Sequence, residues 1–151
     1  MQTEQENFYL HDTAKYGKSI FANRDFAKGE TIFVISGPIV KTPTIYTVPI
    51  DFDLYIDPLS PGKFLNHSCE PSCGIKNRTE VIAIHDLNKD DEITIDYAMI
   101  IDEYDQTRLK QNLGCNCGSK ICRGEFGSYK KLSEELRQKY AGFISDYLLE
   151  K

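Results

Sequence analysis

The chain has 151 residues, of which 40% are hydrophobic and 27% charged, and its net charge at pH 7 is -5. This length suits one globular domain with its own core, and the negative charge argues against general binding to nucleic-acid phosphates, which requires a basic face. No hydrophobic run reaches the roughly 18 residues of a membrane span, and the acidic N-terminus is unlike a signal peptide. We therefore expect a soluble, intracellular protein that binds neither membranes nor nucleic acids directly and whose charge suits a basic partner.

The first half of the chain predicts short β-strands. Residues 19–22 form a short apolar run, and residues 31–36 are β-branched and aromatic, which is typical of a buried strand. Residues 23–30 between them predict a turn broken by a glycine. Residues 44–57 predict one or two further strands, which prolines keep short.

The second half predicts two more strands and then helices. Residues 81–84 and 92–97 predict strands that pair with each other across a loop longer than a tight hairpin turn. Residues 102–111 predict a short helix. Apolar side chains recur at 3- and 4-residue steps from about Leu132 to Leu149, which predicts one amphipathic helix that packs on the body, with Gly142 as a kink or a split.

Between these halves lies a polar stretch, residues 63–73, which reads KFLNHSCEPSC. It has no apolar periodicity long enough for a helix, and its proline and its Asn-His-Ser run favour an irregular backbone. Such a dense polar cluster indicates that its side chains serve a purpose beyond folding.

The cysteines indicate a metal site. Cys115, Cys117 and Cys122 fall within eight residues, and tetrahedral zinc needs a fourth ligand, which Cys69, Cys73 or a histidine would supply. An odd number of clustered cysteines in a chain without a secretory signal favours structural zinc over disulfides or free thiols. Such a metal would pin the C-terminal part of the chain against the polar stretch.

Four motifs, in this order, resemble the SET-domain protein-lysine methyltransferases. Residues 15–22 (KYGKSIFA) resemble the family's N-terminal cofactor loop, and residues 66–71 (NHSCEP) and 91–97 (DEITIDY) resemble its two signature segments. Residues 115–124 (CNCGSKICRG) are similar to its post-SET zinc motif. Together the motifs span about residues 9 to 126.

The resemblance implies a fold and a division of the chain. The fold is mainly β with some α (α+β), made of small twisted sheets with a pseudoknot that holds the Asn-His segment beside the Asp-Tyr strand. We expect a SET domain over residues 8–112, a post-SET zinc segment over residues 113–127 and a C-terminal amphipathic helix within residues 128–151.

The resemblance also implies S-adenosylmethionine as the cofactor and a lysine of a protein, possibly of a histone tail, as the substrate. The cofactor-binding residues that it implies are Gly17, Lys18, Ser19, Lys63, Asn66, His67, Tyr97 and Phe126. Ser19 replaces the family's usual second glycine. The contacts of its backbone survive this change if its φ is negative, but not if the position demands glycine.

For catalysis the resemblance implies Tyr97 as the tyrosine that orients the amine, and Tyr46 as a second tyrosine of the substrate channel. It also places Ile95 and Ile75 in that channel. Neither isoleucine can hold a water by a hydrogen bond, so we expect di- or trimethylation. For zinc, the resemblance favours Cys69 as the fourth ligand beside Cys115, Cys117 and Cys122.

Two functions from different classes remain open at this point. The first is a methyltransferase that uses S-adenosylmethionine. The second is a degenerate SET module that acts as a zinc-stabilised binding scaffold with little or no turnover, which Ser19 favours and the intact Asn66, His67 and Tyr97 disfavour.

Overall fold

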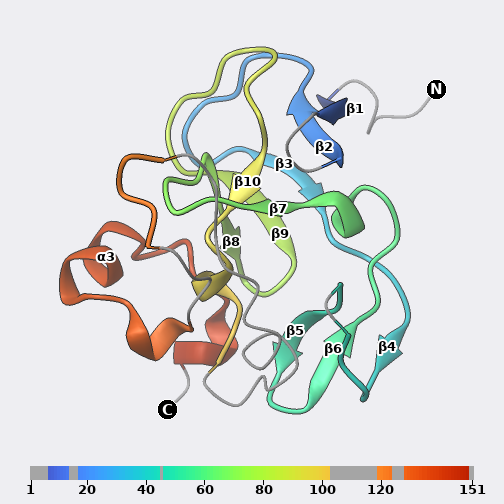
Figure 1. Cartoon of the computed structure of the whole chain (residues 1–151), viewed down its shortest axis with the longest axis vertical. Coiled ribbons are helices and arrows are strands. Elements are labelled where there is room, and N and C mark those ends of the chain that lie inside the picture. The colour runs from blue at the N-terminus through green and yellow to red at the C-terminus, as the bar shows by residue number, and fades with distance from the viewer. Residues whose placement is uncertain (1–6, 14–16, 45, 103–118, 124–127, 150–151) are drawn as a thin grey trace.

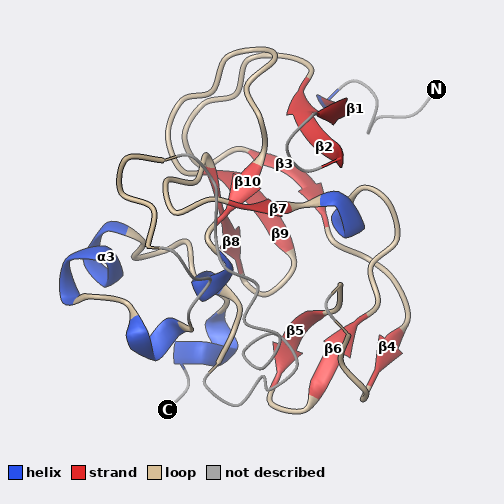
Figure 2. Cartoon of the chain, in the orientation of Figure 1, coloured by secondary structure: helices blue, strands red, loops and turns tan. Residues whose placement is uncertain are grey.

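The computed structural model describes residues 7–13, 17–44, 46–102, 119–123 and 128–149. These residues form small sheets joined by long loops, with a few short helical segments (Figures 1 and 2). The predicted class, mainly β with some α, is confirmed. The strands are β1 (Phe8–Thr13), β2 (Gly17–Ala22), β3 (Thr31–Val34), β4 (Ile39–Val40), β5 (Val48–Asp51), β6 (Leu54–Ile56), β7 (Asn66–His67), β8 (Cys73–Lys76), β9 (Glu80–Ala83) and β10 (Thr94–Ile95).

The helical segments within the described residues are all short. They are the 3₁₀ helices η1 (Gly62–Phe64), η2 (Tyr97–Met99), η3 (Tyr129–Lys131) and η4 (Asp146–Leu149) and the α-helix α3 (Glu134–Lys139). In the part of the chain that the structure describes, no helix is long and apolar enough to cross a membrane. The helix predicted for residues 102–111 lies, apart from its first residue, outside the described residues.

Strand β2 confirms the apolar strand predicted at residues 19–22 and begins earlier, at Gly17. It pairs antiparallel with β1, with Phe8 opposite Ala22 and Thr13 opposite Gly17. The inward side chains of this pair are buried: Phe8 and Ala22 contribute to the hydrophobic core. The pair therefore holds the segment that begins at Gly17 in an extended backbone.

The central sheet has the order β3-β9-β8, and both of its pairings are antiparallel. The predicted strands at residues 31–36 and 81–84 are therefore present, although they are shorter at their C-terminal ends. The predicted pairing of residues 81–84 with residues 92–97 is wrong. Because β9 lies between β3 and β8, its backbone groups on both sides are already used, and no edge is left for a third partner.

Strand β10 pairs instead with β7, in parallel, with Thr94 opposite Asn66 and Ile95 opposite His67. The amide of Ser68 extends the ladder by donating to the Ile95 carbonyl over 2.9 Å. Two segments almost thirty residues apart thereby lie side by side, as the SET resemblance implies.

Residues 44–57 form two strands, β5 and β6, in a sheet of order β4-β6-β5. Pro49 lies in β5, at the edge of this sheet, where its missing N–H costs no ladder hydrogen bond. Asp53 turns the chain between the two strands with a φ of +66°. The prolines therefore restrict the length of this sheet without preventing it.

The prediction of one continuous helix over residues 132–149 is wrong. Helix α3 begins after Ser133, whose hydroxyl accepts a hydrogen bond from the Leu136 amide, and it ends at Lys139. Gly142 then adopts a φ of +89°, a left-handed conformation that interrupts the helix. The apolar side chains still pack on the body as predicted, and the buried ones are Leu132, Tyr140, Ile144, Tyr147 and Leu148.

A single hydrophobic core lies under the central sheet, β10 and the C-terminal segment. The fully buried isoleucines Ile75 of β8, Ile95 of β10 and Ile101, which follows η2, belong to it together with Tyr140 and Tyr147. The residues of the predicted site are attached to this core through β7, β10 and η2.

Candidate active site

Two neighbouring hollows lie on the side of the molecule that carries the predicted site residues. The larger has a volume of about 610 Å³ and is lined by Lys18, Pro38, Tyr46, Asp57, Pro58, Leu59, Lys63, Phe64 and Asn66. The smaller has a volume of about 30 Å³ and is lined by Tyr46, Val48, Gly62, Lys63, Leu65, Ile95, Tyr97 and Ile100. Tyr46 and Lys63 line both, so the two hollows adjoin each other.

The large hollow offers two cations beside an aromatic ring. The Lys63 ammonium lies 5.5 Å from the centroid of the Phe64 ring and the Lys18 ammonium 6.0 Å from it. Lys18 also forms an exposed ion pair with Asp12, over 3.4 Å, and Asp57 adds a carboxylate to the lining. This hollow can therefore bind a ligand that carries both a carboxylate and a flat or cationic group.

The backbone at Ser19, the position of the family's usual second glycine, accommodates the serine. Gly17 has a φ of +79°, which favours glycine, whereas Ser19 is not among the described residues with a positive φ. Ser19 is fully buried in β2, and its hydroxyl accepts a hydrogen bond from the Asn66 side-chain amide over 2.7 Å. The serine is therefore compatible with this backbone, and it holds the Asn66 amide in place.

The His67 side chain is directed into the protein. The backbone amide of Tyr97 donates to its Nδ1 over 2.9 Å, so this nitrogen carries a lone pair, and the neutral ring bears its hydrogen on Nε2. Nε2 lies 3.4 Å from the sulfur of Cys69. Because both ring nitrogens contact the protein, His67 can meet a ligand through its backbone, while its ring connects Cys69 to Tyr97.

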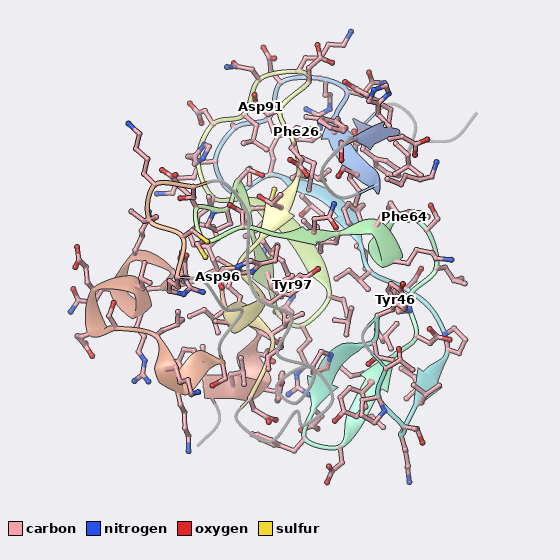
Figure 3. All side chains as sticks on the ribbon, in the orientation of Figure 1. Phe26, Tyr46, Phe64, Asp91, Asp96 and Tyr97 are labelled. Carbon is pink, nitrogen blue, oxygen red and sulfur yellow. The ribbon has the colours of Figure 1, made fainter. Side chains whose placement is uncertain are left out.

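Tyr97 begins η2, directly after the strand β10 that pairs with β7. Its hydroxyl donates to the Leu65 carbonyl over 2.8 Å, and its ring lies 5.1 Å from the His67 ring, centroid to centroid. Tyr46 lines the same small hollow but is 60% exposed. In Figure 3, Tyr97 lies near the centre of the molecule, and Tyr46 lies further towards the β4-β6-β5 sheet.

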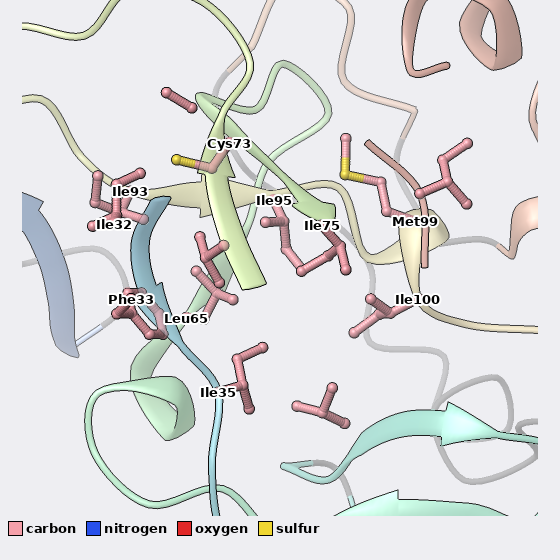
Figure 4. Close-up of a cluster of buried hydrophobic side chains, with 14 of the residues drawn as sticks. Ile32, Phe33, Ile35, Leu65, Cys73, Ile75, Ile93, Ile95, Met99 and Ile100 are labelled. Carbon is pink, nitrogen blue, oxygen red and sulfur yellow. The ribbon is translucent and has the colours of Figure 1, made fainter. Parts of the chain in front are cut away.

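The two predicted channel isoleucines lie in different places. Ile95 is fully buried and lines the small hollow. Ile75 lies in the core and lines neither of the two hollows (Figure 4). The reason is that β8 packs against the C-terminal segment, where the Ile75 amide donates to the Phe143 carbonyl over 2.9 Å.

The described cysteines differ in their surroundings. The sulfur of Cys69, which is fully buried, accepts a hydrogen bond from the Arg123 amide over 3.3 Å, which brings residues 122–123 against the polar stretch. Cys73 instead lies among isoleucines of the core, where burial raises the pKa of its thiol to about 12 (Figure 4). Cys122 is half-buried.

Three predicted residues, Cys115, Cys117 and Phe126, lie outside the described residues. Among the residues that the structure does describe, no group of three or more side chains could hold a metal ion.

Sequence reasoning assigned no role to Asp96, although this residue lies in the quoted DEITIDY segment. Its carboxylate is fully buried. One oxygen accepts from the Ala98 amide over 3.0 Å and from the Arg123 guanidinium over 2.7 Å, and the other accepts from the Tyr140 hydroxyl over 2.9 Å. The only signal in the sequence is the motif itself, because the partners are 27 and 44 residues away.

The titration behaviour of its two side-chain partners reflects this buried charge. Burial and the neighbouring Asp96 raise the pKa of Tyr140, so this phenol remains a hydrogen-bond donor. Burial alone would lower the pKa of Arg123, but the hydrogen bond to Asp96 and its charge outweigh burial and raise it. The guanidinium therefore stays charged and compensates the carboxylate.

The comparisons with known proteins agree with this geometry. The SET domain family matches residues 17–98. Histone-lysine N-methyltransferase 2B of Homo sapiens is 26% identical over 147 residues, which cover 81% of this chain and 5% of that protein. The H3 lysine-36 specific histone-lysine N-methyltransferase of Yarrowia lipolytica is 27% identical over 158 residues, covering 88% of this chain and 20% of that protein. The chain thus spans a small part of the length of these relatives.

Among solved structures, KRYPTONITE in complex with mCHH DNA, an H3(1-15) peptide and SAH superimposes with a TM-score of 0.66 at 23% identity, covering 80% of this chain and 29% of that one. This likeness supports the fold. The post-SET motif lies beyond the residues that the family matches and stays a prediction. The family match itself spans more than half of the sequence and includes residues 17–22 of the first motif and both signature segments, and the chain therefore belongs to the SET-domain family.

Proposed function

We propose that this chain is a protein-lysine N-methyltransferase that uses S-adenosylmethionine. One observation carries the proposal: the small hollow lined by Tyr97 adjoins the large hollow lined by Lys18, Lys63 and Asn66, and Tyr46 and Lys63 line both. A methyl donor in the large hollow and a lysine in the small one would thus meet where the two hollows adjoin, with Tyr97 in the wall of the small one. The two methyltransferase relatives described above support the same reaction class.

The large hollow fits the cofactor by its chemistry. S-adenosylmethionine carries a carboxylate, an ammonium and an adenine ring, and the lining supplies two lysine ammoniums, the Asp57 carboxylate and the Phe64 ring. When bound, the cofactor supplies an electrophilic methyl group on a sulfonium. We assign its binding to Gly17, Lys18, Ser19, Lys63, Asn66, the backbone of His67, Tyr97 and, by resemblance, Phe126.

The walls of the small hollow prepare the amine. A lysine amine has a pKa of about 10.4 in water and must lose its proton to become a nucleophile. The buried side chains of Leu65, Ile95 and Ile100 line the hollow, and desolvation of the amine against them would lower its pKa.

Tyr97 then orients the amine. Because its hydroxyl hydrogen is donated to the Leu65 carbonyl, its oxygen presents lone pairs that can accept from the amine or from the polarised methyl group. Alignment of the reacting atoms at roughly 3 to 3.5 Å is the main contribution required of the protein.

Ile95 bears on the number of methyl groups transferred. It lines the small hollow with an apolar side chain, which cannot anchor a water beside the amine. We therefore expect di- or trimethyllysine. Mass spectrometry that finds only monomethyllysine after long incubation with excess cofactor would contradict this expectation.

We also propose a structural zinc ion held by Cys69, Cys115, Cys117 and Cys122. The support from the described residues is that the buried Cys69 sulfur accepts the Arg123 amide and lies next to His67, since zinc-bound thiolates are usually surrounded by N–H donors. The Cys69→Ser variant should lose the metal, and the Cys73→Ser variant should retain it. One zinc per chain in Cys69→Ser would refute the assignment.

For the substrate we propose a basic peptide segment, possibly a histone tail, because the net charge of the chain is -5. The test offers tritiated S-adenosylmethionine to core histones, a basic peptide array and a cell lysate. We expect label in at least one lysine-containing protein with the wild type. Absence of label from all three would refute the proposal.

The alternative of a scaffold without turnover relied on Ser19. With a strand backbone at Ser19 and a hydrogen bond from Asn66, that support is weaker. Calorimetry separates the two functions, because a zinc-loaded protein that binds neither S-adenosylmethionine nor S-adenosylhomocysteine can only be a scaffold.

A further inference from the structure

The C-terminal segment, residues 140–147, contacts the segment that carries Tyr97 at three successive points. The Tyr140 hydroxyl donates to Asp96, the Ser145 amide donates to the Met99 carbonyl over 3.0 Å, and the Tyr147 hydroxyl donates to the Ile100 carbonyl. In Figure 1 this orange-to-red segment lies against the short helix η2 that follows β10. The contacts therefore hold both ends of the segment 96–100, at Asp96 and at Met99 and Ile100.

The first of these contacts differs from the others because its acceptor is a charge. Asp96 is fully buried, and a buried carboxylate is tolerated only when its oxygens are well paired. Arg123 and the Ala98 amide bind one oxygen, and Tyr140 binds the other. The orientation of the Asp96 carboxylate is thus fixed from two sides, by Arg123 and by Tyr140 of the C-terminal segment.

Asp96 in turn fixes the backbone of Tyr97. Its carboxylate caps η2 through the Ala98 amide, which sets the turn that begins at Tyr97. The Tyr97 amide is held by His67 and its hydroxyl by Leu65. A rotation of the Asp96 carboxylate would therefore tilt the turn and move the Tyr97 ring within the small hollow.

We propose that Tyr140 is a positioning residue for Tyr97: through Asp96 it fixes the orientation of the tyrosine that lines the small hollow. The expected effect of Tyr140 on the rate of methyl transfer rests on the proposed function, whereas its effect on the orientation of Tyr97 does not. It gives the C-terminal segment, which lies outside residues 17–98 of the family match, a part in the site.

The variant that tests this is Tyr140→Phe, which keeps the buried ring and removes only the hydroxyl. The matched control is Tyr147→Phe. Tyr147 lies in the same segment and is as fully buried as Tyr140, but its hydroxyl donates to a backbone carbonyl. Arg123→Lys serves as a second test variant, because it keeps the charge but loses the guanidinium geometry at Asp96. All are compared at a temperature at which circular dichroism shows the folded state.

The first measurement needs no activity. The nine tyrosines are labelled with 3-fluorotyrosine, and the ¹⁹F resonance of Tyr97 is assigned by its loss in Tyr97→Phe. We expect this resonance to shift in Tyr140→Phe and in Arg123→Lys and to stay in place in Tyr147→Phe. An unshifted Tyr97 resonance in Tyr140→Phe, or an equal shift in Tyr147→Phe, overturns the proposal.

The second measurement is the rate. We expect Tyr140→Phe to lower kcat about tenfold at an unchanged affinity for S-adenosylhomocysteine, since small misplacements of an aligning group are costly. In a Tyr97→Phe background the same substitution should have almost no further effect, because it acts through Tyr97. An equal loss in both backgrounds overturns the proposal. An inactive wild type would instead refute the proposed function, and the fluorine resonance would still decide the positioning role.

Discussion

Restoring the family's glycine at Ser19 should weaken the cofactor site. The Ser19→Gly substitution removes a hydroxyl that holds the Asn66 amide over 2.7 Å and places glycine in the interior of β2. The lost hydrogen bond costs about 1 kcal/mol, and glycine in a strand costs about 0.5 to 1 kcal/mol more. We therefore expect the free energy of unfolding to fall by about 1.5 to 2 kcal/mol in urea titrations.

The same change bears on binding. If the freed Asn66 amide must be reoriented when the cofactor binds, about 1 kcal/mol of affinity is lost, which is a roughly fivefold rise in the Kd for S-adenosylhomocysteine by calorimetry. The control is Ser19→Ala, which keeps the strand and loses only the hydroxyl. It should show the same rise in Kd with the smaller loss of stability. A Ser19→Gly protein that binds as tightly as the wild type, or more tightly, would refute this reasoning.

Three further predictions concern the fold around the site. Gly74→Ala should lower the free energy of unfolding, measured in urea, by about 1 to 3 kcal/mol. The reason is that a Cβ there would lie 3.0 Å from the Phe143 carbonyl oxygen and closer still to the Phe143 Cβ. An unchanged urea midpoint would contradict this packing. Gly17→Ala meets no neighbour but must adopt a φ of +79°, so we expect a cost of about 1 kcal/mol and weaker binding of S-adenosylhomocysteine; calorimetry that finds wild-type affinity would argue against a role of this backbone in the site. Burial raises the pKa of the Cys73 thiol from 9.0 to about 12, so the folded state holds this proton more tightly and loses stability as the pH rises through that range. Between about pH 8 and about pH 10.5 the urea midpoint of the wild type should therefore fall more than that of Cys73→Ala, and parallel curves would contradict the buried thiol.

Motif spacing and the SET resemblance predict some of the residues that line the two hollows, among them Lys18, Lys63, Asn66 and Tyr97, but not the prolines and leucines that complete the linings. Gly17, Asn66 and Tyr97 come from distant parts of the chain, and the parallel pairing of β7 with β10 brings the last two together as the SET resemblance implies. Short strands were also predictable, because β-branched runs between turn residues are a local signal.

Strand partners and helix ends were not predictable in the same way. The partner of β9 depends on which edges other strands have already used, and residues 81–84 carry no local mark of that. Apolar residues at 3- and 4-residue steps predicted a continuous C-terminal helix, but the same side chains are buried by short turns on either side of Gly142. Periodicity reports which side chains are buried and not whether the backbone between them is continuous.

The network at Asp96 was the least accessible to sequence reasoning. Its partners Arg123 and Tyr140 are ordinary residues in their own segments, and only the folded chain brings their side chains to one buried carboxylate. Ile75 illustrates the same limit, since an apolar residue at the expected spacing suits the core as well as a channel.

The most direct test of the proposed function is the rate of methyl transfer to one lysine peptide, measured for the wild type and for Tyr97→Phe at saturating S-adenosylmethionine. The hydroxyl of Tyr97 is the group that we assign to alignment, so we predict a fall in kcat of at least about tenfold with little change in cofactor affinity. Equal rates for the two proteins, or no transfer by a wild type that binds no cofactor, would contradict the account.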